Sequence, residues 1–217
     1  MNKVPIVSLF LLLTIISACS TKVDVEKVSA EICACMGEVP RASVEHQNAC
    51  YEEAFSEMTD RVQNDDLLDS ITVRVIKHLG RNCEALARSQ IGIANGSFTT
   101  INKDQESKLT TEQCRQFNND KHYYYFEGYG DTTLVHATKD LWEERFPDGS
   151  FSRLKFNWTE GCSYENVFIE SNHYLKKYLS TPSEVYHYKV IDVDTLKRQY
   201  TVYAYPGKFI VEMKINY

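Results

Sequence analysis

The sequence lacks a run of basic residues that could follow a nucleic-acid backbone. Its 24 lysines and arginines are outnumbered by 30 aspartates and glutamates, which gives a net charge of −6. Because neutralisation of phosphates by clustered cations supplies most of the affinity for nucleic acids, we expect no nucleic-acid partner. The chain also has no long low-complexity tract and no internal repeat, which argues against repeat arrays.

Ordered catalytic motifs are missing too. There is no G-x-S-x-G, no H-E-x-x-H and no phosphate-cradling glycine loop. The histidines of the second half, and the acidic residues that could serve them, follow no motif: His122, His136, His173, His187, Asp131, Asp140, Glu143 and Glu144. We therefore expect no catalytic residues, no cofactor and no metal. A hydrolase that uses an unrecognised histidine site remains the third and least favoured interpretation.

The one long apolar run lies at the start of the chain, over residues 4–16, and it follows Lys3. It is too short to span a bilayer, which takes about 20 apolar residues. A cationic start, an apolar core and small residues before a cut are the parts of a secretory signal. The small residues here are Ser17 and Ala18, and Cys19 follows them.

This segment resembles a bacterial lipoprotein signal. The resemblance implies cleavage after residue 18 and acylation of Cys19, so that palmitate-type chains tether the body through the segment 19–24. A cysteine with three acyl chains would be held in the membrane essentially permanently. Ser20 stands where an aspartate would favour retention in the inner membrane, so the resemblance points to the outer membrane, on its periplasmic face rather than the cell surface.

Seven cysteines become six once Cys19 is acylated, and an even number in an oxidising compartment favours disulfides. Four of them precede residue 90 and two follow residue 111, which predicts pairing within each half. Cys114 with Cys162 is then the only choice in the second half.

The other four cysteines leave two arrangements. Cys33 and Cys35 lie about 200° apart around a helix, so they cannot bond each other. A helical hairpin that turns near Pro40 slightly favours Cys33 with Cys50 and Cys35 with Cys83. The arrangement that pairs Cys35 with Cys50 is nearly as good. Together with His46 these residues also have the right atoms for a zinc site, but an exported chain favours disulfides.

Residues 25–89 have helical periodicity. Apolar positions recur at helical spacing, Gly37 and Pro40 end the first helix, and Ser43 suits the N-cap of the second. We predict a small helical domain that disulfides hold together. Periodicity disappears over residues 90–111, which we interpret as a linker.

Residues 112–217 alternate with period two between regularly spaced turn signals, which predicts seven or eight short antiparallel strands. The fold class is therefore α+β, a helical bundle followed by an antiparallel β meander. Such a sheet curls to hide its edges, and we expect a lipocalin-like half barrel or a sandwich.

Three residues near the middle of this half, Trp158, Cys162 and Tyr164, form a W-x-x-x-C-x-Y arrangement after an opening cysteine, Cys114. This arrangement resembles small secreted β proteins of Bacteroidota. The likeness covers roughly the last hundred residues, and it implies no known activity.

Tyrosines are abundant in the β half, and alternation sends neighbouring ones to opposite faces. Tyr123, Tyr125, Tyr186 and Tyr188 are our candidates for ligand contact, because aromatic rings with polar tips bind sugars, peptides and apolar ligands. The alternative is that these tyrosines are ordinary strand-forming residues that contact no ligand. We expect a non-enzymatic binding module for a protein, a glycan or a small apolar ligand; the rival is an envelope structural or assembly component without a ligand pocket.

Overall fold

The structure, a computed structural model, describes residues 23–39, 43–62, 64–91, 98–101, 103–119, 121–127 and 130–217. The expected signal segment and the lipidation residue Cys19 lie outside this part of the chain. No helix within it is both long enough and apolar enough to cross a membrane.

The described residues of the N-terminal part form four helices: α1 (Val25–Gly37), α2 (Val44–Arg61), α3 (Asp65–Asn82) and α4 (Glu84–Ile91). Polar side chains cap the first three, because Asp24, Ser43 and Asn64 each accept a hydrogen bond from a backbone N–H of the first turn. The N-cap predicted at Ser43 is confirmed. The apolar faces meet in one core around Ile32 and Val75, both fully buried.

Two disulfides cross this helical core, and they correct the pairing that the hairpin argument favoured. Cys33 bonds Cys83, and Cys35 bonds Cys50. The favoured pairs, Cys33 with Cys50 and Cys35 with Cys83, are therefore wrong. The hairpin argument considered α1 and α2 alone, whereas α1 lies against α2, α3 and α4 together. The two cysteines lie on opposite sides of α1, so that Cys35 faces α2 and Cys33 faces the end of α3.

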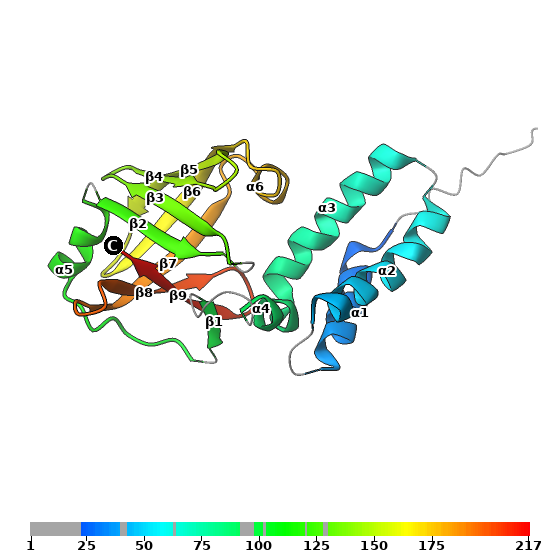
Figure 1. Cartoon of the computed structure of the whole chain (residues 1–217), viewed down its shortest axis with the longest axis horizontal. Coiled ribbons are helices and arrows are strands. Elements are labelled where there is room, and N and C mark those ends of the chain that lie inside the picture. The colour runs from blue at the N-terminus through cyan, green and yellow to red at the C-terminus, as the bar shows by residue number, and fades with distance from the viewer. Residues whose placement is uncertain are drawn as a thin grey trace, which may run out of the picture.

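The second part is a closed antiparallel barrel (Figure 1). Its eight strands are β2 (Lys121–Phe126), β3 (Thr132–Ala137), β4 (Leu141–Arg145), β5 (Phe151–Trp158), β6 (Ser163–Ser171), β7 (Val185–Asp194), β8 (Gln199–Tyr205) and β9 (Ile210–Asn216). Each strand pairs with the next along the chain, and β9 pairs with both β8 and β2. The α+β class and the barrel-like curl are confirmed, but the half barrel or sandwich is wrong. Tyr124 opposite Asn216 completes the ring of strands.

Part of the segment interpreted as a linker is a ninth strand, β1 (Phe98–Ile101), which pairs with β9 outside the ring. Four residues are too few to show a period. Three short helical segments were also not anticipated: α5 (Thr111–Arg115), the 3₁₀ turn η1 (Gln116–Asn118) and α6 (Lys176–Leu179). A signal for α5 was present, because Thr110 and Gln113 form a capping box.

The α5 and η1 segment closes one end of the barrel (Figure 1). Phe117 is fully buried there, with its ring centroid 5.0–5.8 Å from the rings of Tyr123, Trp142, Tyr164 and Tyr200. Cys114 bonds Cys162 in the turn between β5 and β6, the pair predicted for this half. This end of the barrel is thus filled by stacked side chains and held by a covalent bond.

The helical part contacts the barrel at the other end, where α3 lies near α6 (Figure 1). Glu184, just before β7, accepts a hydrogen bond from Lys77 Nζ at 2.6 Å and forms an ion pair with Arg81. The backbone N–H of Lys208 donates to the carbonyl of Arg81 at 3.2 Å. A Cβ at Gly207 would clash with that same carbonyl, so the contact requires glycine.

The Cys114–Cys162 disulfide should contribute strongly to the stability of the barrel. It spans 48 residues, so the chain-entropy relation predicts that Cys114→Ala/Cys162→Ala lowers the free energy of unfolding of the barrel by about 4 kcal/mol. The Cys35–Cys50 disulfide spans only 15 residues, so Cys35→Ala/Cys50→Ala should lower the free energy of unfolding by about 3 kcal/mol. Urea unfolding of each variant, followed by near-UV circular dichroism, measures both. An unchanged unfolding midpoint in the first variant would contradict the expected role of the disulfide.

Candidate binding site

The four tyrosines nominated for ligand contact all belong to β2 and β7 and point into the barrel. Tyr123 and Tyr125 are buried, with 2% and 4% of their surfaces exposed. Tyr186 and Tyr188 are half-buried and pack against the same core. Tyr124, between the first two, is 39% exposed on the outer face. The alternation expected from the sequence therefore directs the nominated set inward.

The four occupy different depths. Tyr123 lies at the closed end, where its hydroxyl donates to the backbone carbonyl of Phe117 and its ring stacks on the Phe117 ring. Burial raises its pKa well above the usual value, so it stays a neutral donor. Tyr125, Tyr186 and Tyr188 lie toward the α6 end, where the interior becomes polar.

A buried carboxylate marks this polar interior. Glu144 on β4 points inward beside Trp142, and only 11% of its side chain is exposed. Its Oε1 atom accepts a hydrogen bond from the hydroxyl of Tyr125 at 3.0 Å and one from Nε1 of Trp142 at 3.3 Å. Two neutral donors, one from β2 and one from β4 itself, thus hold the carboxylate in one orientation.

Lys176 reaches this carboxylate from α6. Its Nζ atom lies 3.9 Å from Oε2 of Glu144 and 4.0 Å from Oε1 of Glu127, which itself accepts a hydrogen bond from Thr133. The Phe146 ring lies near the same ammonium, with its centroid 5.8 Å away. We call Glu144, Glu127, Tyr125, Trp142 and Lys176 the Glu144 centre.

Burial and charge act in opposite directions on the pKa of Lys176 but in the same direction on the pKa of Tyr125. Burial lowers the pKa of Lys176, but the carboxylates of Glu144 and Glu127 outweigh it and raise that pKa above its usual value. Burial, reinforced by Glu144, raises the pKa of Tyr125, so its hydroxyl remains a donor. The centre contains two carboxylates and one ammonium, so it can attract a further cation.

The polar interior continues toward β6 and β7. Asn166 is 2% exposed on β6, between the inward residues Tyr164 and Phe168, and its Oδ1 has no hydrogen-bond partner among the described residues. Tyr186 lies opposite Asn166 in the strand register, and its hydroxyl donates to Ser180 at 2.8 Å. A buried acceptor without a donor is costly in an interior, which points to a ligand or a water as its partner.

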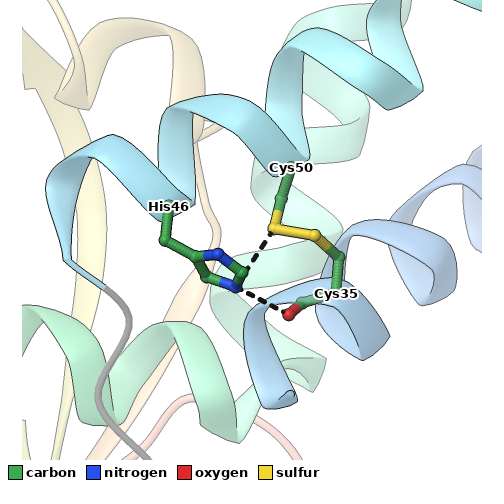
Figure 2. A group of neighbouring side chains, drawn as sticks. All are labelled: Cys35, His46 and Cys50. Carbon is green, nitrogen blue, oxygen red and sulfur yellow. Dashed lines mark hydrogen bonds between the residues drawn. A yellow bond between two sulfur atoms is a disulfide. The ribbon is translucent and has the colours of Figure 1, made fainter. Parts of the chain in front are cut away.

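The cysteine and histidine group considered for zinc is a disulfide site (Figure 2). Cys35 and Cys50 are bonded to each other, and Nε2 of His46 lies 3.0 Å from the carbonyl oxygen of Cys35 and 3.7 Å from Sγ of Cys50. This is the one group of metal-ligating atoms found among the described residues. Its sulfurs are oxidised, so they offer no thiolates to a metal.

The histidines of the β half do not gather around one acid. His122 and His136 stack on the outer face of β2 and β3, with centroids 4.7 Å apart. Glu143 faces His136 across the strands, but both of its oxygens bind arginines, Arg145 and Arg153.

His173 packs on the Phe146 ring near α6, and Nδ1 of His187 lies 3.3 Å from Glu165 on the outer face. The hypothesis of a histidine hydrolase finds no cleft that unites its residues within the described chain.

Sequence reasoning nominated Tyr125 but did not predict that it forms a centre with Glu144 and Lys176. Glu144 was considered only as a partner for histidines, although its spacing from Trp142 places both on one strand face. Lys176 and Asn166 had no motif to mark them. Asn166 could have been found from its place between Tyr164 and Phe168 in an alternating strand.

Comparison of the chain with protein-family models, with curated proteins and with solved structures finds no match.

Removal of the Tyr125 hydroxyl should destabilise the barrel, because a hydrogen bond to a buried carboxylate is lost. We expect Tyr125→Phe to lower the free energy of unfolding by about 2 kcal/mol. Tyr124→Phe is the matched control, since that ring lies on the outer face of the same strand. Urea unfolding monitored by tryptophan fluorescence gives both values. Equal effects of the two substitutions would show that the interior hydroxyl has no special role.

Proposed function

We propose that the protein is a lipid-anchored outer-membrane lipoprotein with a non-enzymatic binding barrel, which takes a small ligand at the Glu144 centre. The ligand would have an apolar body and a positively charged nitrogen. The observation that carries this proposal is the buried Glu144 carboxylate, which two neutral donors orient and which shares one ammonium with Glu127.

A purely structural core does not call for such a group. Burial of an ion pair contributes little net stability, and apolar residues of similar volume often replace one without loss. The nominated tyrosines Tyr125, Tyr186 and Tyr188 lie around the centre and offer rings on which an apolar cation can pack. The unpartnered Oδ1 of Asn166 adds an acceptor for a ligand N–H or O–H.

The ligand would enter the barrel beside α6. This helix has only four residues, and its N-cap residue Leu175 makes no side-chain hydrogen bond. Lys176 projects from it toward both carboxylates. We propose that the ammonium of a ligand takes the place of the Lys176 ammonium when α6 moves outward.

The anchor rests on the resemblance of residues 1–19 to a lipoprotein signal, with Cys19 as the acylated residue. Support comes from the three disulfides, since such bonds persist in oxidising compartments such as the periplasm. The rival, an envelope structural component without a pocket, is favoured by the filled end of the barrel around Phe117.

Trp142 is a built-in reporter of ligand binding, because its Nε1 atom donates to Glu144. In a Trp158→Phe background it is the sole tryptophan of the chain. We expect hexylammonium to change its fluorescence saturably, whereas hexanol and hexanoate, with the same alkyl chain, change it much less. Lys176→Met should strengthen hexylammonium binding about tenfold, and Glu144→Gln in the same chain should remove that gain.

Lys177→Met serves as the control, because Lys177 lies beside Lys176 but over the exposed ring of Tyr178. Equal responses to all three probes, or no saturable response in Lys176→Met, would favour the structural rival.

The anchor predicts a change in cell fractionation. Cys19→Ser should prevent acylation, so that the protein leaves the outer-membrane fraction and is found either in the soluble fraction or with its signal uncleaved. A membrane flotation gradient measures the fraction, and mass spectrometry detects the acyl groups. Ser20→Asp should shift it from the outer to the inner membrane, and Ser20→Ala should not. Retention of Cys19→Ser in the outer membrane would contradict acyl anchoring.

A further inference from the structure

A groove lies between α1 and α3, beside the turn that joins β8 to β9. It comprises two adjoining cavities that share His78 and Asn82, with volumes of about 330 and 360 Å³. Lys208 from the barrel lines the first cavity, and Arg74, Lys77 and Arg81 line the second. We call this surface the α1–α3 groove.

Positive charge exceeds negative charge in the groove, although the chain as a whole is acidic. Four cationic side chains, Arg74, Lys77, Arg81 and Lys208, face two carboxylates, Glu26 and Glu184. Burial and then the neighbouring Arg81 lower the pKa of Lys77, even though Glu184 is its partner. The charge of the groove is thus incompletely neutralised, which favours an anion.

His78 lies where the two cavities of the groove meet. Nδ1 of His78 is buried and makes no hydrogen bond with any described residue, while Asn82 donates to the His78 carbonyl at 2.9 Å. His78 lines both cavities, so a single anion there would also be near the flanking cations.

The groove begins where the tether ends. Val25 and Glu26, in the first turn of α1, line the second cavity. Only six positions separate Val25 from Cys19, so an extended chain of that length reaches at most about 20 Å. If Cys19 is acylated, the groove must therefore stay close to the surface of the leaflet that holds the acyl chains.

We infer that the α1–α3 groove binds the phosphate of an anionic lipid headgroup in the leaflet that holds the anchor. This inference rests on the lipid anchor proposed above. Lipid binding would orient the body against the membrane and leave the far, closed end of the barrel pointing away from it. A tether alone leaves the body free to rotate, whereas a second contact fixes its orientation.

Vesicle binding tests the groove without the acyl chains. The full chain with Cys19→Ser is titrated with vesicles of phosphatidylcholine alone and of equal parts phosphatidylcholine and phosphatidylglycerol, and the bound fraction is measured by sedimentation. The phosphatidylcholine vesicles report any contribution from the apolar segment 4–16. We expect a clear preference for the anionic vesicles that added salt weakens.

Arg74→Gln/Lys208→Gln removes two groove cations and leaves the Glu184 ion pairs intact. Each basic residue near an anionic surface contributes about fivefold, so this variant should bind anionic vesicles about thirtyfold more weakly. Arg115→Gln/Lys155→Gln is the matched control, since both side chains are exposed on the barrel and away from the groove. An equal loss in the control would reduce the effect to net charge and overturn the inference.

Inorganic phosphate distinguishes the sources of the anion. At an ionic strength matched with chloride, phosphate should release the protein from anionic vesicles more effectively than chloride does. Thermal stabilisation by phosphate without any binding to anionic vesicles would overturn the lipid assignment. Because these assays use Cys19→Ser, their outcome is independent of acylation, which the fractionation experiment tests separately.

Discussion

Phe117 at the closed end of the barrel is the contact on which the rest of the β part depends. Its ring fills the space between residues from four strands, and Cys114, three residues earlier, bonds the turn between β5 and β6. A barrel of eight strands has an interior just wide enough for side chains to fill. With one end filled by rings, the buried carboxylate of Glu144 lies toward the other end, near Lys176 of α6.

The end of the barrel near α6 contacts both the Glu144 centre and helix α3. The segment between β6 and β7 carries Lys176, which contacts the Glu144 centre, and Glu184, which binds Lys77 and Arg81 of α3. The α6 segment therefore belongs to both the barrel interior and the contact with the helical part. If a ligand displaces Lys176, α6 moves against α3, which it contacts. The same helix α3 also lines the α1–α3 groove. The barrel and the groove are thus connected through one short segment.

The three disulfides divide between the two parts, two in the helical part and one in the barrel. In the helical part, α1 carries Cys33 and Cys35 on opposite sides, so its two bonds reach α2 and the end of α3. Small domains with limited cores gain from such links, because cross-links restrict the unfolded chain. The contact between the parts is instead ionic and backbone-mediated, so it can yield without breaking a covalent bond.

The sequence alone determined the order of the parts, the period of their elements and the division of cysteines. Helical spacing up to residue 89, alternation after residue 112 and the N-cap at Ser43 depend on local preferences, which neighbouring residues express by themselves. The pairing of Cys114 with Cys162 followed from counting. Tertiary structure decided three contacts that no local pattern contains. Strand β9 pairs with β2 and closes the barrel, Cys33 bonds Cys83, and Lys176 lies beside Glu144. These contacts join residues far apart in the chain, and their geometry depends on how whole elements pack together.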